Sequence, residues 1–562
     1  MLEKINSVKD LKALNIDELK LLDQDIKNVL INKLTDTGGH LGPNLGITEL
    51  TIALHYVFNS PVDKFVFDVS HQTYTHKILT GRKDAYISKE KYGSVSGFTT
   101  PSESEHDLFK IGHTSTSISL ALGLAYGRDI NKGKENIIAI IGDGSLSGGE
   151  AFEGLDNAAL LKSNFIIIVN DNEMSIASNV GGIYKSLEDL RNSNGKSENN
   201  FFKTLGFDYI YEENGNDIES LISLFRKIKD IDHPLIIHIH TEKGNGYKFA
   251  VDNKELTHYY TPPKFLSKHS VAGIMGEYLV EKVKHDDKIL IVNAATPIAV
   301  GFTPERRQEI DGKFIDVGIC EEHAIGFVSG LAKSGIKPIM CVMSSFVQRC
   351  YDQLNQDLAM NNSPAKIIIY NGTIAGGDCT HVGMFDIGLV NNIPSIVCLS
   401  PMSINEMKKM IDWMINYDNH PVIIRSPVAE IEDIEEIETN FDASNFDKYQ
   451  IIYSGSEIAI LALGSAFGLG KEVYDKLKEK GFNPTLINPR IYSSLDRECL
   501  DNLLLNHNVV VTIENGVKDG GWGNTVSSYF GDKFVSVLNY GADKLFNDLK
   551  KKEEIIKDCR YN

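Results

Sequence analysis

The sequence has no hydrophobic run of membrane-spanning length, and its opening stretch, MLEKINSVKD, contains no apolar signal core. We therefore expect a cytoplasmic protein that is neither secreted nor inserted in a membrane. Its 7 cysteines are scattered without C-x-x-C spacing. This distribution argues against structural zinc and disulfides and favours reduced thiols.

Positive charge is also scarce. Lysine and arginine number 57 against 76 aspartates and glutamates, which gives a formal net charge of −19. This balance argues against nucleic acid or an anionic membrane as a partner, although it permits a locally basic pocket for phosphates. We expect small-molecule partners instead.

The chain has 562 residues, of which 42% are hydrophobic, enough for about three or four domains. Short apolar runs alternate with helical periodicity, which predicts an α/β protein of three domains, each a mostly parallel sheet flanked by helices. Shifts in composition predict α/β domains at 1–250, 269–428 and 450–562, joined by a linker at 251–268 and an acidic linker at 429–449.

Two predicted strands organise the first domain. Asn136–Ile141 and Phe165–Val169 are short, apolar and rich in β-branched residues, and a helical pattern lies between them. Such a unit is parallel and right-handed by default. Asp143 and Asn172, which follow the two strands, should therefore lie side by side at the edge where α/β sheets bind ligands.

Hard oxygen ligands that suit Mg²⁺ follow the two strands. They are the Asp143 carboxylate, the Asn172 side-chain amide and a backbone carbonyl just beyond the second strand, assigned to Met174. Because Mg²⁺ keeps positions for phosphates, this set predicts a bound diphosphate, approached by the backbone N–H groups of Gly144 and Ser145. Two ordinary tight turns are the alternative. A dinucleotide fold is disfavoured, since residues 142–148 lack the G-x-G-x-x-G spacing.

These motifs resemble those of the transketolase-like thiamine diphosphate enzymes, and in particular of the 1-deoxy-D-xylulose-5-phosphate synthase family. Five segments carry the resemblance in the expected order: 38–46, 71–72, 76–82, 112–117 and 170–175. The resemblance implies thiamine diphosphate and Mg²⁺ as cofactors, and a homodimer. It also implies transfer of a two-carbon unit from pyruvate to glyceraldehyde 3-phosphate, within isoprenoid and thiamine biosynthesis.

The resemblance also implies roles for residues of the first domain. His40 and His71 would act beside the thiazolium ring, although a lone histidine is more often structural. Five further positions would contact the cofactor: Gly112, His113, Thr114, Lys243 and Tyr247. For the segment at 112–117, a serine and threonine cluster at a helix start is also a good N-cap.

In the second domain, Glu321 follows a predicted strand and opens a helix. Acidic residues in a first helical turn favour the helix dipole and need no other purpose. The resemblance makes Glu321 the acid that activates the cofactor's aminopyrimidine, a role that a buried carboxyl with a raised pKa performs best. Glu322 is the competing candidate.

The resemblance makes Phe346 the ring stacked on the pyrimidine and Arg349 a polar, catalytic and substrate-binding contact. Core packing and a surface ion pair are the ordinary alternatives for these two residues. The resemblance further assigns Asp378 and His381 to a loop that binds substrate, with His381 also catalytic. This loop is one residue shorter than the family pattern.

The departures from the family concentrate on the acceptor side. Met343 and Asn371 stand where a tyrosine and an arginine are expected to hold the acceptor phosphate, and only Arg425 remains. Tyr260 is the nearest residue to an expected histidine. A polar loop at 190–200, which we expect to be mobile and near the site mouth, is shorter than usual.

Four functions stay open on the sequence alone. They are the family reaction, the same donor chemistry with another aldehyde, a transketolase, and a catalytically silent thiamine diphosphate-binding or assembly subunit. The last would require damage to the catalytic set, which looks complete. No catalytic constellation occurs in the third domain, to which the resemblance gives a structural and dimerising role.

Overall fold

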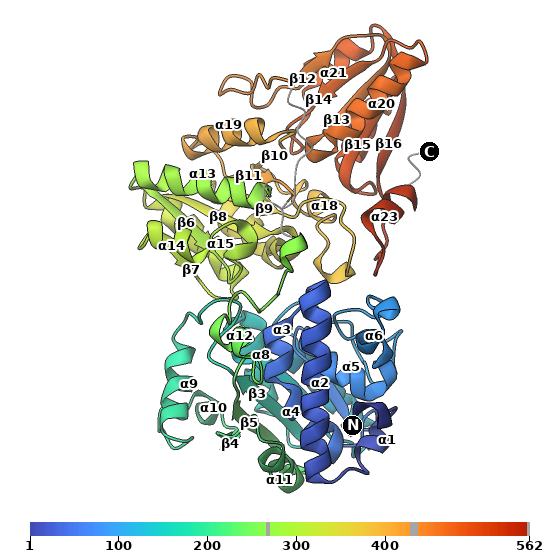
Figure 1. Ribbon diagram of the computed structural model, residues 1–562. Coiled ribbons are helices and arrows are strands. Elements are labelled where there is room, and N and C mark those ends of the chain that lie inside the picture. Colours follow the sequence, from blue (N-terminus) through green and yellow to red (C-terminus); the bar gives the residue numbers. More distant parts are fainter. Residues whose placement is uncertain (266–269, 428–436, 559–562) are drawn as a thin grey trace. The chain divides into compact units, whose positions relative to one another are not determined.

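The computed structural model describes residues 1–265, 270–427 and 437–558. It contains three sheets with flanking helices (Figure 1). The described chain divides into two compact units: residues 1–265 with Gly318–Cys320, and the remaining described residues. The predicted α/β fold class is confirmed.

The first unit contains a parallel five-stranded sheet in the order β1-β2-β3-β5-β4. Its strands are β1 (Lys64–Phe67), β2 (Ile137–Gly142), β3 (Phe165–Asp171), β4 (Asp208–Glu212) and β5 (Pro234–His240). Its helices are α1 (Val8–Leu11), α2 (Ile16–Thr37), α3 (Leu41–Gly46), α4 (Thr48–Val57), α5 (Tyr74–Lys77), α6 (Asp84–Ile87), α7 (Ser117–Ile130), α8 (Gly149–Ala158), α9 (Ile183–Asn192), α10 (Phe201–Thr204), α11 (Ile218–Ile228) and α12 (Lys248–Asp252).

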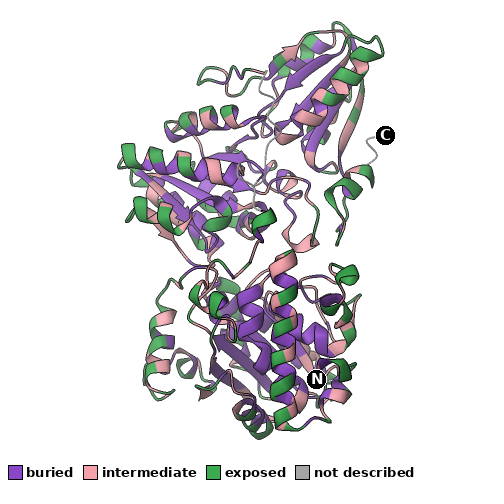
Figure 2. Cartoon of the chain, viewed as in Figure 1, coloured by how far each residue is buried: buried purple, intermediate pink, exposed green. Residues whose placement is uncertain are grey.

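Alternate residues of the central strands feed two separate cores, because side chains along a strand point to opposite faces. Ile166 and Ile168 of β3 pack with α2, α4 and α11, whereas Ile167 and Val169 pack with α7, α8 and α9. Both faces of the sheet are therefore covered, and Figure 2 shows its central strands buried while exposed residues gather on the outer helices.

The predicted strand, helix, strand unit is confirmed as β2, α8 and β3. The prediction of a polar loop at 190–200 is wrong at its first residues, because α9 continues to Asn192. Leu187 and Leu190 are buried in the core under this helix, and their packing outweighs the polar composition around them.

The second unit contains two sheets. The first is parallel, with six strands in the order β10-β11-β9-β8-β6-β7. The strands are β6 (Ile289–Asn293), β7 (Phe314–Asp316), β8 (Lys337–Met343), β9 (Lys366–Tyr370), β10 (Val397–Leu399) and β11 (Val422–Arg425). The helices are α13 (Val271–His285), α14 (Pro304–Glu309), α15 (Glu321–Lys333), α16 (Ser344–Val347), α17 (Tyr351–Gln353), α18 (Asp386–Val390) and α19 (Ile404–Ile415).

The other sheet has the order β12-β14-β13-β15-β16, with β12 antiparallel and the rest parallel. Its strands are β12 (Gln450–Tyr453), β13 (Glu457–Leu463), β14 (Thr485–Asn488), β15 (His507–Val517) and β16 (Ser536–Ala542). Its helices are α20 (Phe467–Glu479), α21 (Arg497–Leu503), α22 (Trp522–Phe530) and α23 (Lys552–Asp558).

Residues 429–436 of the acidic linker predicted at 429–449 lie outside the described residues. Its described part is not fully solvated, because Thr439 and Phe441 are buried. The Phe441 ring contacts Trp413 with ring centroids 5.9 Å apart. An aromatic side chain within an acidic stretch has therefore joined the core of the second unit.

Candidate active site

The tips of β2 and β3 meet as predicted. Asp143 is 1% exposed, and its Oδ1 accepts a hydrogen bond from the backbone N–H of Asn172 at 3.4 Å. Its Oδ2 accepts from the side-chain amide of Asn179 at 2.6 Å. Burial, together with the neighbouring Asp171 carboxylate, raises the pKa of Asp143. A cation at this position would favour the charged carboxylate.

The loop after β3 folds back on itself beside Asp143. The backbone N–H of Met174 donates to Asn172 Oδ1 at 3.3 Å, and Met174 forms an isolated bridge with Ser178. A Cβ on Gly144 would lie 2.6 Å from the Cβ of Ser175. Only glycine allows Ser175 to approach the backbone of this turn so closely.

A second loop is held against the first tip by Asp68. Its carboxylate accepts hydrogen bonds from the backbone N–H groups of Ser115 at 2.8 Å and Ser117 at 3.0 Å, at the start of α7. The Ser115 hydroxyl donates to the carbonyl of Ser145 at 2.8 Å. Ser115, which follows Thr114 in the sequence, is therefore fixed beside Ser145. Asp68 provides the capping that the sequence assigned to the serine and threonine cluster.

His40 and His71 come together in the first unit, with ring centroids 4.7 Å apart. The buried side-chain amide of Asn44 donates to both of their backbone carbonyls, at 2.7 and 2.8 Å. Asn44 Oδ1 accepts from the backbone N–H of Tyr74 at 2.9 Å. One amide therefore sets the spacing of two histidines that are distant in sequence.

A third histidine, His258, joins this pair, and sequence reasoning missed it. Its ring centroid lies 5.2 Å from that of His71 and 5.7 Å from that of His40. Tyr260 is the residue nearest in sequence to the histidine expected from the family, and its backbone forms an isolated β-bridge with Gly39. The first unit thus keeps a third imidazole beside the pair.

Lys243 lies beside the new histidine. Its Nζ donates to the Ser175 carbonyl at 2.6 Å and lies 3.2 Å from His258 Nδ1. Burial lowers the pKa of Lys243 to about 8. Desolvation of the half-buried ring, together with the Lys243 charge, lowers the pKa of His258. Tyr247 packs against the apolar cluster that contains α2.

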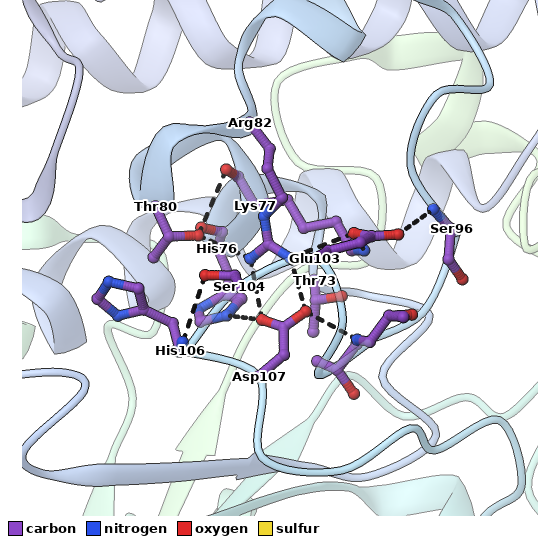
Figure 3. Close-up of polar contacts among 12 residues, drawn as sticks. Thr73, His76, Lys77, Thr80, Arg82, Ser96, Glu103, Ser104, His106 and Asp107 are labelled. Atoms are coloured by element: carbon purple, nitrogen blue, oxygen red, sulfur yellow. Dashed lines mark hydrogen bonds and ion pairs between the residues drawn. The ribbon is translucent and has the colours of Figure 1, made fainter.

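A buried ionic network lies next to the segment that carries His71 (Figure 3). Asp107 accepts two hydrogen bonds from the Arg82 guanidinium, at 2.6 and 2.9 Å, and lies 2.9 Å from His76 Nε2. Glu103 binds Lys77 at 2.5 Å. Burial alone would raise the pKa of Asp107, but the bonds to His76 and Arg82 lower it well below its usual range.

Replacing Arg82 by methionine should lower the free energy of unfolding by about 3–5 kcal/mol, because Asp107 would remain buried without its main partner. Urea denaturation of the full chain, followed by circular dichroism, measures this loss. Arg226→Met is the matched control, since Arg226 is exposed on α11 and should cost less than ~1 kcal/mol. Equal stability of the two variants would contradict the assignment of the network as a structural support.

In the second unit, Glu321 begins α15 and is 3% exposed. Its Oε2 has no hydrogen-bond partner among the described residues, and Arg349 Nη1 lies 3.8 Å from it. Burial raises the pKa of Glu321 to about 7, against the opposing charge of Arg349. Glu322 is more exposed. The structure therefore favours Glu321 over Glu322 as the functional acid.

Phe346 and His381 also meet, with ring centroids 5.7 Å apart and nearly perpendicular planes. Thr380 Oγ1 lies 2.7 Å from His381 Nδ1 and 2.8 Å from Asp378 Oδ1, so it connects the two predicted substrate residues. Asn371 adopts a positive φ of 60° at the end of β9, and its amide donates to the His381 carbonyl at 3.0 Å. Asn371, which stands where the family has an arginine, therefore helps to shape the loop that carries Asp378 and His381.

Arg425 is 2% exposed and is engaged inside the second unit. Its Nε binds both carboxylate oxygens of Asp386 at 2.9 Å. Its Nη2 donates to the carbonyls of Gly383 at 3.1 Å and Asn515 at 2.7 Å. These contacts join α18, the loop before it and β15, which is the pattern of a buried structural ion pair.

The chain was compared with families and individual proteins. The model described as 1-deoxy-D-xylulose-5-phosphate synthase matches residues 2–198 and 193–241. The transketolase pyrimidine-binding domain matches 267–432, and the transketolase C-terminal domain matches 447–546. Among the described helices, none combines the length and hydropathy that a membrane crossing requires.

Full-length relatives carry the same family name. The 1-deoxy-D-xylulose-5-phosphate synthase of Caldanaerobacter subterraneus is 37% identical, over 97% of this chain and 94% of its own length. That of Alkaliphilus oremlandii is also 37% identical, over 95% of this chain and 92% of its own. A crystal structure of a Pichia stipitis transketolase mutant matches 98% of this chain and 96% of its own at 14% identity and a TM-score of 0.45.

Proposed function

The chain belongs to the 1-deoxy-D-xylulose-5-phosphate synthase family, and from this premise we propose that it makes 1-deoxy-D-xylulose 5-phosphate from pyruvate and glyceraldehyde 3-phosphate. It is then a thiamine diphosphate-dependent transferase of isoprenoid biosynthesis. The observation that carries the proposal is Glu321, a buried acid with a pKa of about 7 and one carboxylate oxygen without a hydrogen-bond partner among the described residues.

The residues of the first unit suit the diphosphate and its metal. Asp143, Asn172 and the Met174 carbonyl would hold Mg²⁺, and the Gly144 turn would receive the phosphates. Lys243 would offset negative charge, because an anion nearby favours its ammonium form. Gly112, His113 and Thr114 would complete this end of the site from the loop that Asp68 fixes.

The residues of the second unit suit the aminopyrimidine. When bound, thiamine diphosphate supplies the carbon nucleophile and the electron sink that decarboxylation of pyruvate needs. Glu321 would donate a hydrogen bond to the pyrimidine ring nitrogen, and Phe346 would pack against the ring. Arg349, at 3.8 Å, limits how far burial raises the pKa of Glu321, and we propose that it also contacts substrate.

Three histidines of the first unit would handle protons and substrate oxygens. His40 and His71 are spaced by Asn44, and His258 adds a third imidazole. Burial and the neighbouring Lys243 charge lower the pKa of His258, which favours its neutral imidazole. His381 and Asp378 would bind substrate from the second unit.

The predicted role of Arg425 at the acceptor phosphate is the assignment that its contacts support least, since Asp386 already neutralises its charge. We expect Arg425→Ala to lower kcat/KM equally for glyceraldehyde 3-phosphate and for unphosphorylated glyceraldehyde. Steady-state kinetics measure the ratio of kcat/KM for glyceraldehyde 3-phosphate to kcat/KM for glyceraldehyde. If Arg425 bound the phosphate, the substitution would instead lower this ratio by roughly 10–100-fold.

Asp386→Ala provides the companion variant, because it removes the other half of the same ion pair. It should change the two kcat/KM values as Arg425→Ala does. If only the arginine variant loses its preference for the phosphorylated aldehyde, Arg425 binds the phosphate after all, and its contact with Asp386 is secondary.

The proposed function is tested by assaying purified protein with thiamine diphosphate, Mg²⁺, pyruvate and glyceraldehyde 3-phosphate. Release of CO₂ together with formation of the five-carbon ketose phosphate is the expected result. Absence of CO₂ release with any aldehyde would rule out the donor, and activity with ketose phosphate donors would indicate a transketolase. Met343 and Asn371 favour one second candidate, the same donor chemistry with another aldehyde, which an aldehyde screen detects.

We further propose that Mg²⁺ is the natural metal, that the product also supplies thiamine biosynthesis, and that the enzyme acts as a homodimer in the cytoplasm. The domain bounds proposed from the sequence, 1–250, 269–428 and 450–562, fit one sheet each. Analytical ultracentrifugation of the holoenzyme measures the oligomeric state, and a single species of monomer mass would contradict the homodimer.

A further inference from the structure

The loop of residues 374–385 carries Asp378 and His381, and we call it the substrate loop. It connects the end of β9 with α18 in the second unit. Its later half is fastened to the sheet, because Asn371 donates to the His381 carbonyl and Arg425 to the Gly383 carbonyl. Its earlier half contacts a different part of the chain.

That part is the C-terminal segment of residues 546–558, which follows β16 and includes α23. Gly377 and Lys550 form an antiparallel bridge: the Gly377 N–H donates to the Lys550 carbonyl at 3.0 Å, and the Leu549 N–H donates to the Gly377 carbonyl at 2.9 Å. The Cys379 N–H donates to Asp548 Oδ1 at 3.3 Å. The substrate loop thus has a backbone partner about 170 residues further along the chain.

Apolar side chains reinforce this pairing. Ile555 of α23 is 1% exposed and belongs to a small cluster, separate from the larger cores of the unit. The Phe546 and Phe385 rings lie 5.8 Å apart, and Figure 1 shows α23 next to the chain that leads into α18. The other buried members of the cluster are Ile374, Val382, Met384, Val517 and Ala542.

Two consecutive glycines in the loop fit this contact. A Cβ on Gly376 would lie 2.6 Å from the backbone nitrogen of Lys552 and 2.8 Å from the Lys550 carbonyl oxygen. Gly377 has a φ of 115°, which side chains rarely adopt. Gly376 is therefore explained by the close approach of the C-terminal segment, and Gly377 by its own backbone conformation.

We propose that the C-terminal segment is a positioning element that holds the substrate loop, and with it Asp378 and His381, in the conformation used to bind the acceptor aldehyde. The proposal rests on the proposed function, which gives Asp378 and His381 their role. Ile555 and Asp548 act through the loop and are positioning residues. The segment lies at the end of the chain and contains none of the residues assigned to the cofactor.

The test uses the full-length holoenzyme with Ile555→Ala and, separately, Asp548→Ala. Hydrogen exchange of the amides in the substrate loop should become about tenfold faster, because the free energy of local opening falls when a buried contact is lost. The KM for glyceraldehyde 3-phosphate should rise about tenfold, while the dissociation constant for thiamine diphosphate, measured by calorimetry, should stay within about twofold.

Ile556→Ala is the matched control, since Ile556 is the next residue in α23, is only partly buried and lies outside the cluster. Ile555→Val keeps most of the apolar contact and should restore both exchange and KM. If Ile555→Ala and Asp548→Ala both behave as Ile556→Ala does, the proposal is overturned. If Ile555→Ala loosens the whole unit, Asp548→Ala decides, because it removes the hydrogen bond from the Cys379 N–H without removing a buried apolar side chain.

The two proposals fail separately. An inactive wild-type enzyme would remove the proposed function, whereas the exchange rates of the substrate loop would still report whether the C-terminal segment holds it. A wild-type enzyme with the expected activity, but with unchanged KM and exchange in both variants, would remove only the positioning role.

Discussion

Glu321→Gln should lower kcat by about 10²–10⁴-fold and leave the dissociation constant for thiamine diphosphate nearly unchanged. Glutamine keeps the size and can still donate a hydrogen bond to the pyrimidine nitrogen, but it cannot transfer a proton. Steady-state rates of CO₂ release and calorimetric titration with the cofactor measure the two quantities. A variant with more than about a tenth of wild-type kcat would exclude Glu321 as the activating acid.

Glu322→Gln is the matched control, because it makes the same change at the next residue. Its kcat should stay within about twofold of wild type, since Glu322 is more exposed than Glu321. The opposite pattern would transfer the role to Glu322 and require a different rotation of α15.

Stability gives a measurement for Glu321 that does not depend on activity. Its folded-state pKa of about 7 lies above the ordinary 4.5, so folding favours the protonated carboxyl. This group therefore lowers the free energy of unfolding as pH rises from 4.5 to 7. In the absence of cofactor, Glu321→Gln should be more stable than wild type above pH 7, by at most about 3 kcal/mol, and equal to it near pH 4.5.

Asp143→Asn should weaken binding of thiamine diphosphate at saturating Mg²⁺ by at least about 100-fold. Loss of an outer-shell partner of a metal ligand typically costs 10–100-fold, and loss of the ligand itself should cost no less. Asparagine can still accept the hydrogen bond from Asn179, so the fold is preserved. Calorimetric titration measures the change directly.

Thermal unfolding provides a second readout for Asp143. At a cofactor concentration 100 times the wild-type dissociation constant, the wild type should gain about 2.7 kcal/mol of stability and Asp143→Asn only about 0.4 kcal/mol. Asp156→Asn, on the exposed face of α8, is the control and should behave as wild type. Equal stabilisation of all three proteins would show that Asp143 does not bind the metal.

Local signals were sufficient to predict the tips of the first sheet and the acid of the second unit. The strands before Asp143 and Asn172 are short, apolar and rich in isoleucine and valine, and parallel pairing then determines which ends meet. Glu321 follows the strand that ends at Asp316 after a short turn, so its place at a helix start could be predicted as well.

Residues that act through distant partners could not be predicted in this way. His258 lies in a stretch without periodicity, and only the folded chain brings its ring to His71. Asn44 and Asn179 give no local signal, because each has a hydrogen-bond partner at least 27 positions away. Amide side chains also occur commonly on protein surfaces.

Arg425 shows the complementary limit. Its position relative to the family pattern predicted a phosphate ligand, but its carboxylate partner, Asp386, is 39 residues away and lies in a helix of only five residues. Residue types and spacing do not reveal which of several acids will pair with a buried arginine. The distinction depends on tertiary packing around the end of β11.

The alternating packing of β3 has an evolutionary consequence. Because successive residues of this strand serve opposite cores, a one-residue insertion or deletion inside it would exchange its two faces and displace Asn172 from Asp143. Length changes in the turn after α9 leave that register untouched. During evolution, the surface connections of this protein can therefore change in length, while the interior of its central strands tolerates substitutions but not insertions or deletions.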